Sequence, residues 1–271
     1  MPNMRLIYSN IVDTSTITAS STAGSLTVAN LKNDYKGKVH RSTGTSVTYT
    51  ITFPSATQVG GVCLPATNLS PTSTIRVRLY NSATLIADST TIQACPGATL
   101  ELWDWSVPLN ANSFVFGGAS KTAVWFNNQQ SATSAVIDIV DTSNSAGYID
   151  CARLVIGPYW EPTYNVSNNI SITLADTSSN VRNDSGDLLS DRGTIYESLS
   201  IDFSVLLETD KSTLVKILRK VGTSKNILIS VFPDNNSISE QMHLIYGKRS
   251  NSSVDMELYG IYTHAIDIEG W

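Results

Sequence analysis

The feature that most constrains the fold is a strict two-residue alternation of apolar and hydroxyl side chains between Ser46 and Phe53. The alternating apolar residues are Val47, Tyr49, Ile51 and Phe53. Because successive side chains of a strand point to opposite faces, this pattern predicts an antiparallel strand with one buried face and one solvated face. Pro54 is expected to end the strand, since proline cannot donate to a ladder.

Short apolar segments recur along the whole chain and are separated by Gly, Pro, Asn and Ser. In the first half, strands are expected at 4–9, 46–53, 59–65, 75–80, 84–87, 113–116, 122–126, 134–140 and 148–156. In the second half, strands are expected at 169–174, 194–207, 225–232, 241–246 and 254–268. This nearly regular series indicates a mainly β chain whose first half is a β-sandwich or jelly roll.

One segment has the periodicity of a helix. Its apolar residues fall at i, i+3, i+4 and i+7, and they are Leu214, Ile217, Leu218 and Val221. Thr209 or Asp210 can cap its beginning, and Gly222 can end it. The helix follows a long predicted strand and must bury its apolar face on a sheet. The second half is therefore predicted to be a β-sandwich with one helix.

The segment 148–164 is expected to divide the chain into two domains. It begins as a strand and then meets Gly157, Pro158 and Pro162, which cannot continue a central ladder. The aromatic residues among these prolines are Tyr159, Trp160 and Tyr164. We expect them to anchor an inter-domain connector, with an exposed binding ledge as the alternative. The expected parts are a first domain at 1–157, a connector at 158–168 and a second domain at 169–271.

Composition and charge exclude several classes of protein. Charged residues make up 15% of the chain, well below the roughly 25% of typical globular chains. The net charge is −5 and the basic residues are scattered, so no specific nucleic-acid surface is expected. We expect neither a signal peptide within residues 1–24 nor a membrane segment. Cys63, Cys95 and Cys151 lack metal-ligand spacing and are expected to be buried free thiols, as in a protein folded in a reducing cytoplasm.

The sequence contains no recognised catalytic motif, neither Gly-x-Ser-x-Gly, His-Glu-x-x-His nor a phosphate loop. We therefore expect no enzymatic activity, no cofactor and no metal site. His40, His243 and His264 are expected to have structural roles. The loop 175–193 carries four aspartates, Asp176, Asp184, Asp187 and Asp191. A solvated loop is the expectation, although loops rich in carboxylate oxygens can hold calcium.

Tryptophans are the candidate glycan-binding residues, because the apolar face of a sugar ring stacks on an aromatic ring. The candidates are Trp103, Trp105 and Trp125. Trp103 and Trp105 are two residues apart in an alternating segment and are expected to share one face. The alternative for all three is packing in the core or between domains, since large aromatic side chains dominate protein cores.

The order of elements in the first half resembles the galactose-binding-like, discoidin-type jelly roll. The matching pieces are residues 30–31 and 41–42, the strand 47–53, the buried segment 59–64 followed by 68–70, the strand 75–80 and the closing segment 148–157. The closing segment, which precedes Trp160, also resembles tail-associated proteins of bacteriophages. A β-sandwich with one helix after a long strand is similar to the tail-tube and distal-tail fold of siphophages. The order of the two domains departs from the familiar distal-tail order.

This resemblance implies a structural component of a phage tail tip or baseplate. Such a protein would form a ring, a hexamer, around the tail channel and contact tube, hub or tail-fibre proteins. Its peripheral jelly roll could contact host surface glycans, and its location would be the virion after assembly in the bacterial cytoplasm. The alternative is a carbohydrate-binding module protein without an assembly role. A hydrolase is a third hypothesis, for which the sequence supplies no nucleophile and base arrangement.

Overall fold

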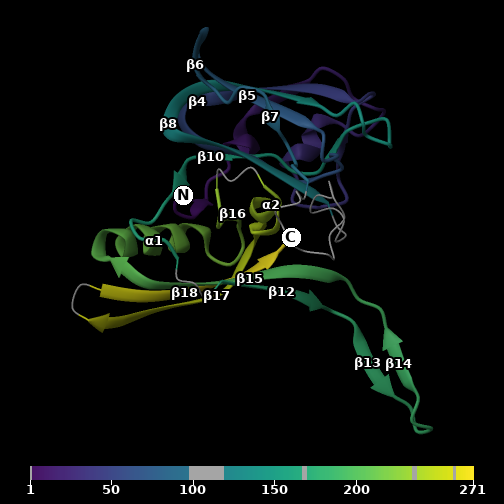
Figure 1. Cartoon of the computed structure of the whole chain (residues 1–271), viewed down its shortest axis with the longest axis vertical. Helices are drawn as coiled ribbons and strands as arrows, with labels where there is room; N and C mark the ends of the chain where they lie inside the picture. The colour runs from purple at the N-terminus through teal and green to yellow at the C-terminus, as the bar shows by residue number, and fades with distance from the viewer. Residues whose placement is uncertain (1, 98–118, 167–169, 234–236, 259–260) are drawn as a thin grey trace. The chain divides into compact units, whose positions relative to one another are not determined.

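The computed structural model describes the 271-residue chain except residues 1, 98–118, 167–169, 234–236 and 259–260 (Figure 1). The chain divides into two compact units. The first comprises Met1–Glu161 and Leu228–Leu244, and the second comprises Pro162–Ile227 and Ile245–Trp271. The segment Leu228–Leu244, which falls within the expected second domain, thus belongs to the first unit.

The first unit is built on a large antiparallel sheet with nine strands among the described residues. These strands are β2 (Thr16–Ala19), β3 (His40–Arg41), β4 (Ser46–Thr67), β5 (Thr74–Asn81), β6 (Thr84–Asp88), β7 (Ile92–Gln93), β8 (Ser120–Val140), β9 (Asp150–Cys151) and β10 (Val155–Gly157). The main path through the sheet is β3-β9-β4-β8-β5-β6, with β2 and β10 on β4 and β7 on β5. Two 3₁₀ helices, η1 (Ile11–Thr14) and η2 (Val28–Lys32), lie in the same unit.

Strands β4 and β8 are much longer than expected, and they pair along most of their length. The predicted strands 46–53 and 59–65 are both parts of β4, and 122–126 and 134–140 are both parts of β8. Pro54 does not end its strand, so that prediction was wrong. It lies where the register shifts between Thr52 and Thr57, and such an irregularity requires no ladder hydrogen bond from proline.

The core of the first unit forms where the alternation predicted it. The four apolar residues of 46–53 are buried, and Tyr49 and Ile51 are completely inaccessible. They share one core cluster with Val77 of β5 and Ile137 of β8. Complete burial of one such side chain stabilises a fold by about 1.5–3 kcal/mol, so this sheet face contributes several kcal/mol to the stability of the unit.

Outside the nine-stranded sheet, three further strands pair in an order in which β1 (Arg5–Ile7) is central. It pairs with β11 (Tyr159–Trp160) on one side and with β16 (Asn226–Ser230) on the other. The predicted strand 148–156 is not continuous, because it is divided into two short strands, β9 and β10, which pair with β4 at separate places. The predicted strand 241–246 also begins as a helix, α2 (Ile238–Met242), which Ser237 caps through its side chain.

The second unit contains an antiparallel sheet and the longest described helix. Its strands are β12 (Ile170–Asp176), β15 (Ile195–Leu207), β17 (Leu244–Leu258) and β18 (Ile261–Gly270), in the order β17-β18-β15-β12. Helix α1 (Glu208–Val221) follows β15 directly and buries the four predicted residues, so the predicted helix is confirmed. Gly222 ends it with a φ of 61°, which glycine adopts without strain. The N-cap is Leu207 rather than Thr209 or Asp210.

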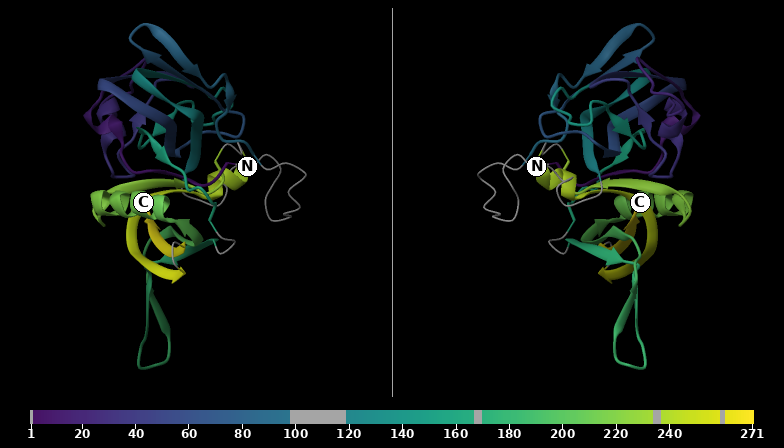
Figure 2. Two further views of the ribbon diagram at one scale, coloured as in Figure 1. Left: turned by 90° about the vertical axis from the view of Figure 1, so that its left-hand side faces the viewer. Right: turned by 90° about the vertical axis from the view of Figure 1, so that its right-hand side faces the viewer.

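The expected polar loop 175–193 is instead a β-hairpin. Strand β13 (Ser179–Arg182) pairs with β14 (Leu188–Asp191), and Asn183 and Asp187 are hydrogen-bonded across the turn. The hairpin projects from the rest of its unit (Figure 2). The sequence concealed it because Ser, Asn, Asp and Arg outnumber the apolar residues that mark a strand.

The predicted fold class is confirmed, since both units are mainly β and antiparallel, with sandwich-like sheets and one longer helix. The cysteines are free and buried, also as predicted. Burial raises the pKa of the Cys95 and Cys151 thiols to about 12, which keeps them protonated and unreactive. The helices that the structure describes include none with the length and apolar character of a membrane span.

Candidate functional site

The structure places one of the three candidate tryptophans, since Trp103 and Trp105 lie outside the described residues. Trp125 is buried on β8 and stands edge-on to Tyr159, with 5.9 Å between ring centroids. Its Nε1 donates a hydrogen bond of 2.8 Å to the Glu240 carboxylate. A Cβ on Gly61 would lie 2.6 Å from the indole, so the glycine makes room for the ring. Trp125 therefore offers no open ring face and serves the alternative role, packing.

The predicted connector aromatics do not form one connector. Tyr159 and Trp160 pair with Ile7 and Leu6 of β1 inside the first unit. The Arg5 guanidinium lies 4.5 Å from the centre of the Tyr159 ring. Tyr164 lies in the second unit and is exposed. The positions of Tyr159 and Trp160 result from pairing with a strand more than 150 residues earlier in the chain. No local sequence pattern predicts such a pairing.

The histidines and aspartates named from the sequence do not gather into a metal site. His40 is buried and His243 bonds the backbone of α2. Of the aspartates, Asp176 accepts from Ser178, and Asp187 accepts from Asn183. Within the ranges that the structure describes, no three His, Cys, Asp or Glu side chains lie close enough to share an ion.

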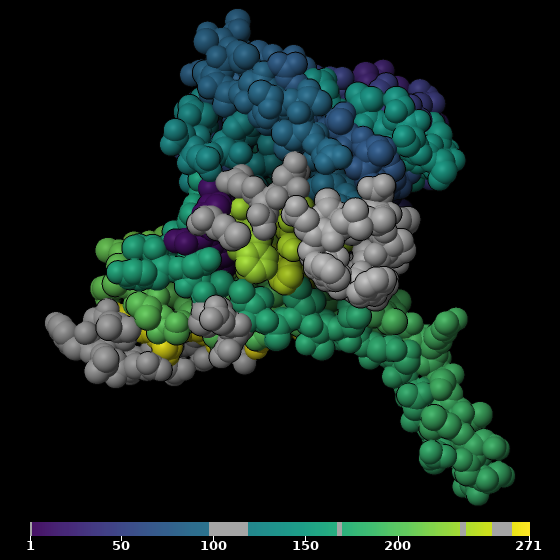
Figure 3. Space-filling model, viewed as in Figure 1, coloured from purple at the N-terminus to yellow at the C-terminus, as the bar shows by residue number. Residues whose placement is uncertain are grey.

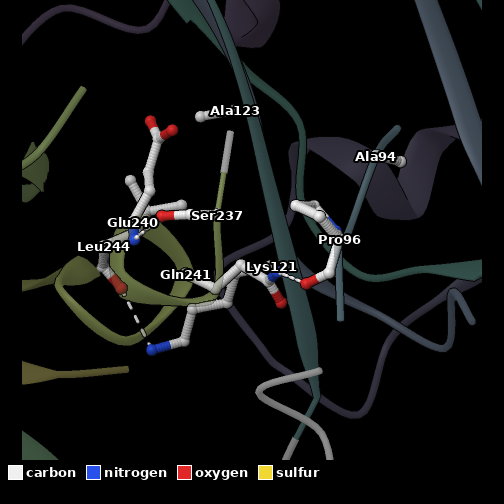
Figure 4. Close-up of a pocket in the computed structure, with 8 residues that line it drawn as sticks. All are labelled: Ala94, Pro96, Lys121, Ala123, Ser237, Glu240, Gln241 and Leu244. Atoms are coloured by element: carbon white, nitrogen blue, oxygen red, sulfur yellow. Dashed lines mark hydrogen bonds between the residues drawn. The ribbon is translucent and has the colours of Figure 1, made fainter. Parts of the chain in front are cut away.

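A small pocket lies between α2 and the sandwich of the first unit (Figure 4). Its lining residues are Ala94, Pro96, Lys121, Ala123, Ser237, Glu240, Gln241 and Leu244. Lys121 donates to the Leu244 carbonyl at 3.0 Å, and Gln241 donates to the Pro96 carbonyl at 2.7 Å. Glu240 accepts from Trp125. These polar groups form hydrogen bonds within the protein that hold α2 against the sandwich. Because they are already engaged, the pocket is a poor candidate for a catalytic site.

A better candidate for recognition is an accessible cluster formed by Arg41, Asp150 and Tyr148, which we call the Arg41 cluster. Arg41 and Asp150 are cross-strand partners on β3 and β9. The guanidinium binds both carboxylate oxygens, each at 2.8 Å. It also lies 3.8 Å from the centre of the Tyr148 ring. The Arg41 side chain is 33% exposed, so the cluster is built at the surface.

Hydrogen bonds from neighbouring loops hold this cluster in place. Asn68 accepts from the backbone N–H of Asp150 at 2.8 Å, and its side-chain amide donates to the Tyr148 carbonyl at 3.0 Å. Asn144 donates to the Asn68 carbonyl at 3.0 Å and to Asp141 at 3.1 Å. Loops 68–70 and 141–149 therefore act as one rigid support, as expected for a binding surface on a β scaffold.

The electrostatics of the cluster favour a fixed, fully charged guanidinium. The hydrogen bonds that Arg41 donates to the Asp150 carboxylate raise the pKa of Arg41 above its usual value. Beneath it, burial lowers the pKa of His40, which keeps that ring neutral at ordinary pH. The ring nitrogens of His40 meet the hydroxyls of Tyr49 at 2.8 Å and Thr22 at 3.2 Å. The charge at this surface therefore comes from the Arg41 and Asp150 pair and not from His40.

This arrangement suits a neutral, hydroxyl-rich ligand. The ion pair uses two of the five guanidinium N–H groups, and each carboxylate oxygen has lone pairs to spare. Donors and acceptors thus stand side by side next to an aromatic ring. Residues 41–42 and 68–70 are among the pieces of the sequence that resemble the jelly roll, but the sequence did not predict this site. The available signal was a cluster of Arg, Asn, Asp and Tyr in segments that flank strands.

Comparison with known proteins leaves the family open. No family model matches the chain, and no curated protein matches it. Among solved structures, the lectin domain of lectinolysin complexed with Lewis b antigen matches at 16% identity and a TM-score of 0.38, over 55% of this chain and 95% of that chain. CBM32-3 from a Clostridium perfringens family 31 glycoside hydrolase matches at 14% and 0.39, over 55% and 94%.

A Streptococcus pneumoniae fucose-binding module matches at 12% identity and a TM-score of 0.38, over 56% of this chain and 99% of that chain. Likenesses of this size carry no argument about the chain.

Proposed function

We propose that the chain is a non-enzymatic carbohydrate-binding protein, with the Arg41 cluster of the first unit as the recognition site. The observation that carries the proposal is the guanidinium held by both oxygens of Asp150 and stacked on Tyr148 at an accessible surface. Carbohydrate binds where fixed polar groups of both kinds lie beside an aromatic face. On this proposal the first unit is a galactose-binding-like jelly roll.

The test is a glycan array, followed by calorimetric titration of the best binder and of free fucose, galactose and N-acetylgalactosamine. Arg41→Ala is expected to weaken binding about 10–100-fold, because a hydrogen bond from a charged group contributes about 1.5–3 kcal/mol. Asp150→Asn is expected to weaken binding as well, since the charged partner that fixes the guanidinium is lost.

Arg76→Ala is the matched control for this test. Arg76 also makes a two-point ion pair across neighbouring strands of the same sheet, with Asp88, and it is similarly accessible. It belongs to β5, away from β3 and β9, and should leave affinity unchanged. Failure of every glycan to bind, or equal losses in Arg41→Ala and Arg76→Ala, would contradict the proposal.

The second candidate function is a structural role in a phage tail tip or baseplate, with the chain forming a ring. One observation favours it. The second unit carries a helix directly after the long strand β15 and a hairpin that projects beyond its sheet. On this reading the unit is tail-tube-like, its partners are other tail proteins, and its location is the virion.

Negative-stain electron microscopy of the purified chain tests the structural role, together with mass spectrometry of purified virions. Rings with a central hole, and the chain among virion proteins, are the expected results. A chain absent from virions would contradict the tail assignment and would leave glycan binding untouched.

A further inference from the structure

The hairpin of the second unit, residues 177–194, presents apolar side chains to solvent, and we call it the arm. All residues of β13 and β14 are exposed. Val181 and Leu189 are direct cross-strand partners, 63% and 58% exposed, and they form an apolar pair on one face of the arm. An isolated two-stranded hairpin is marginally stable in water, so a partner surface would stabilise it.

The apolar face of the sheet continues uncovered toward the arm. On this face, Leu199 and Ile201 of β15 are buried in the unit. Their cross-strand partners on β12 are Ile172 and Ile170, and the next position along the same face is Leu174. Leu174 is 70% exposed and Ile195, at the start of β15, is 68% exposed. The apolar side of the sheet is therefore buried at one end and exposed to solvent at the other, as at a surface that a partner covers.

Strand β12 is also an open edge of the sheet. It pairs with β15 on one side, and among the described strands it is the last in the order. Monomeric proteins protect such edges with charged side chains, prolines or bulges. Strand β12 contains no proline, its one charged residue is Asp176 at its end, and its pairing with β15 has no bulge. The edge is thus available for pairing with another strand.

The charges of the arm indicate what covers it. The arm carries Asp184, Asp187 and Asp191 together with Arg182 and Arg192. Along the chain the two arginines flank the three aspartates, so the arm carries both signs and a small net charge of −1. This suits a protein surface of the same mixed composition and not a polyanion such as nucleic acid. Homo-oligomers form by repeated use of one such self-complementary region.

We propose that the arm and the β12 edge are the self-association surface of this chain, with a second copy of the chain as the occupant. The arm of one copy covers the exposed apolar face of β12 and β15 on the next, or the two edges pair directly. Figure 3 shows the arm standing clear of its own unit, where another copy can reach it. The inference rests on the second unit alone and does not depend on glycan binding.

Sedimentation velocity of the full chain over a concentration series tests the proposal. The wild-type chain is expected to sediment as a multiple of the chain mass. Two variants are expected to weaken association about 10–100-fold each: Leu174→Lys in the β12 edge, and the double variant Val181→Ser with Leu189→Ser in the arm. Loss of the free energy gained by burying one apolar side chain corresponds to a change in affinity of this size. All three positions are exposed, so the substitutions spare the fold.

Leu85→Ser is the matched control, because Leu85 is an apolar residue 48% exposed on another hairpin strand, β6 of the first unit. It should leave association unchanged, and the arm variants should keep any glycan affinity. A wild-type chain that is monomeric at every concentration would overturn the proposal. So would arm variants that sediment like the wild type, or an equal effect of Leu85→Ser.

Discussion

Replacing Tyr49 with alanine is expected to lower the free energy of unfolding of the first unit by about 3–5 kcal/mol, the usual range for removing a large aromatic side chain from a core. Tyr49 is completely buried near the start of β4. Its hydroxyl also meets Nδ1 of His40 at 2.8 Å. Thermal unfolding measures the effect, and about 2–4 °C is lost per kcal/mol in a unit of this size.

Tyr49→Phe separates the packing contribution from the hydrogen bond. It keeps the ring and removes the hydroxyl, and it is expected to cost about 1–3 kcal/mol because a buried nitrogen of His40 loses its partner. If Tyr49→Ala were no more destabilising than Tyr49→Phe, the ring would not be part of the core. That result would contradict the burial that the alternation of 46–53 predicts.

Trp125→Ala is expected to destabilise the first unit by a similar amount, about 3–5 kcal/mol. The indole packs on Tyr159 and over Gly61, and its N–H satisfies the buried carboxylate of Glu240. Its loss leaves a cavity and removes one of the donors to the buried Glu240 carboxylate, which also accepts from the Ser230 hydroxyl at 3.4 Å. Chemical denaturation followed by circular dichroism measures the loss in the free energy of unfolding.

Trp125→Phe is the conservative control and should recover part of the packing but not the hydrogen bond to Glu240. Because the indole is buried, glycan affinity measured well below the unfolding temperature should be unchanged in Trp125→Phe. A variant of unaltered stability that lost glycan binding would instead restore the sugar-platform hypothesis for Trp125. The two readouts therefore separate a packing residue from a recognition residue.

Local sequence patterns correctly predicted the elements whose buried face can be recognised from the spacing of a few neighbouring apolar residues. The alternation at 46–53 identified the core face of β4, and the four-residue apolar series of α1 identified both its existence and its buried side. Both depend on which side of one element is apolar. Strand lengths were predicted less well, because β4 continues past Pro54 only where the partner strand β8 accepts a shifted register.

The candidate site was harder to predict for the same reason. Trp125 is conspicuous in the sequence, yet its role follows from Glu240, more than 100 residues away. Arg41 and Asp150 are inconspicuous, and they become a site because β3 and β9 pair with those two residues opposite each other. A pair of this kind has no local signal, since its two members are far apart in the chain.

The sequence by itself determined the mainly β class, the position and face of the helix, and the free buried state of the cysteines. These follow from composition and short-range periodicity. Tertiary structure alone decided that Leu228–Leu244 returns to the first unit, that 179–191 forms a hairpin, and that Arg41 meets Asp150. The first and the last depend on pairing between strands far apart in the chain, and the hairpin depends on pairing between two consecutive polar strands. Backbone hydrogen bonds, which set all of these pairings, are the same for every sequence.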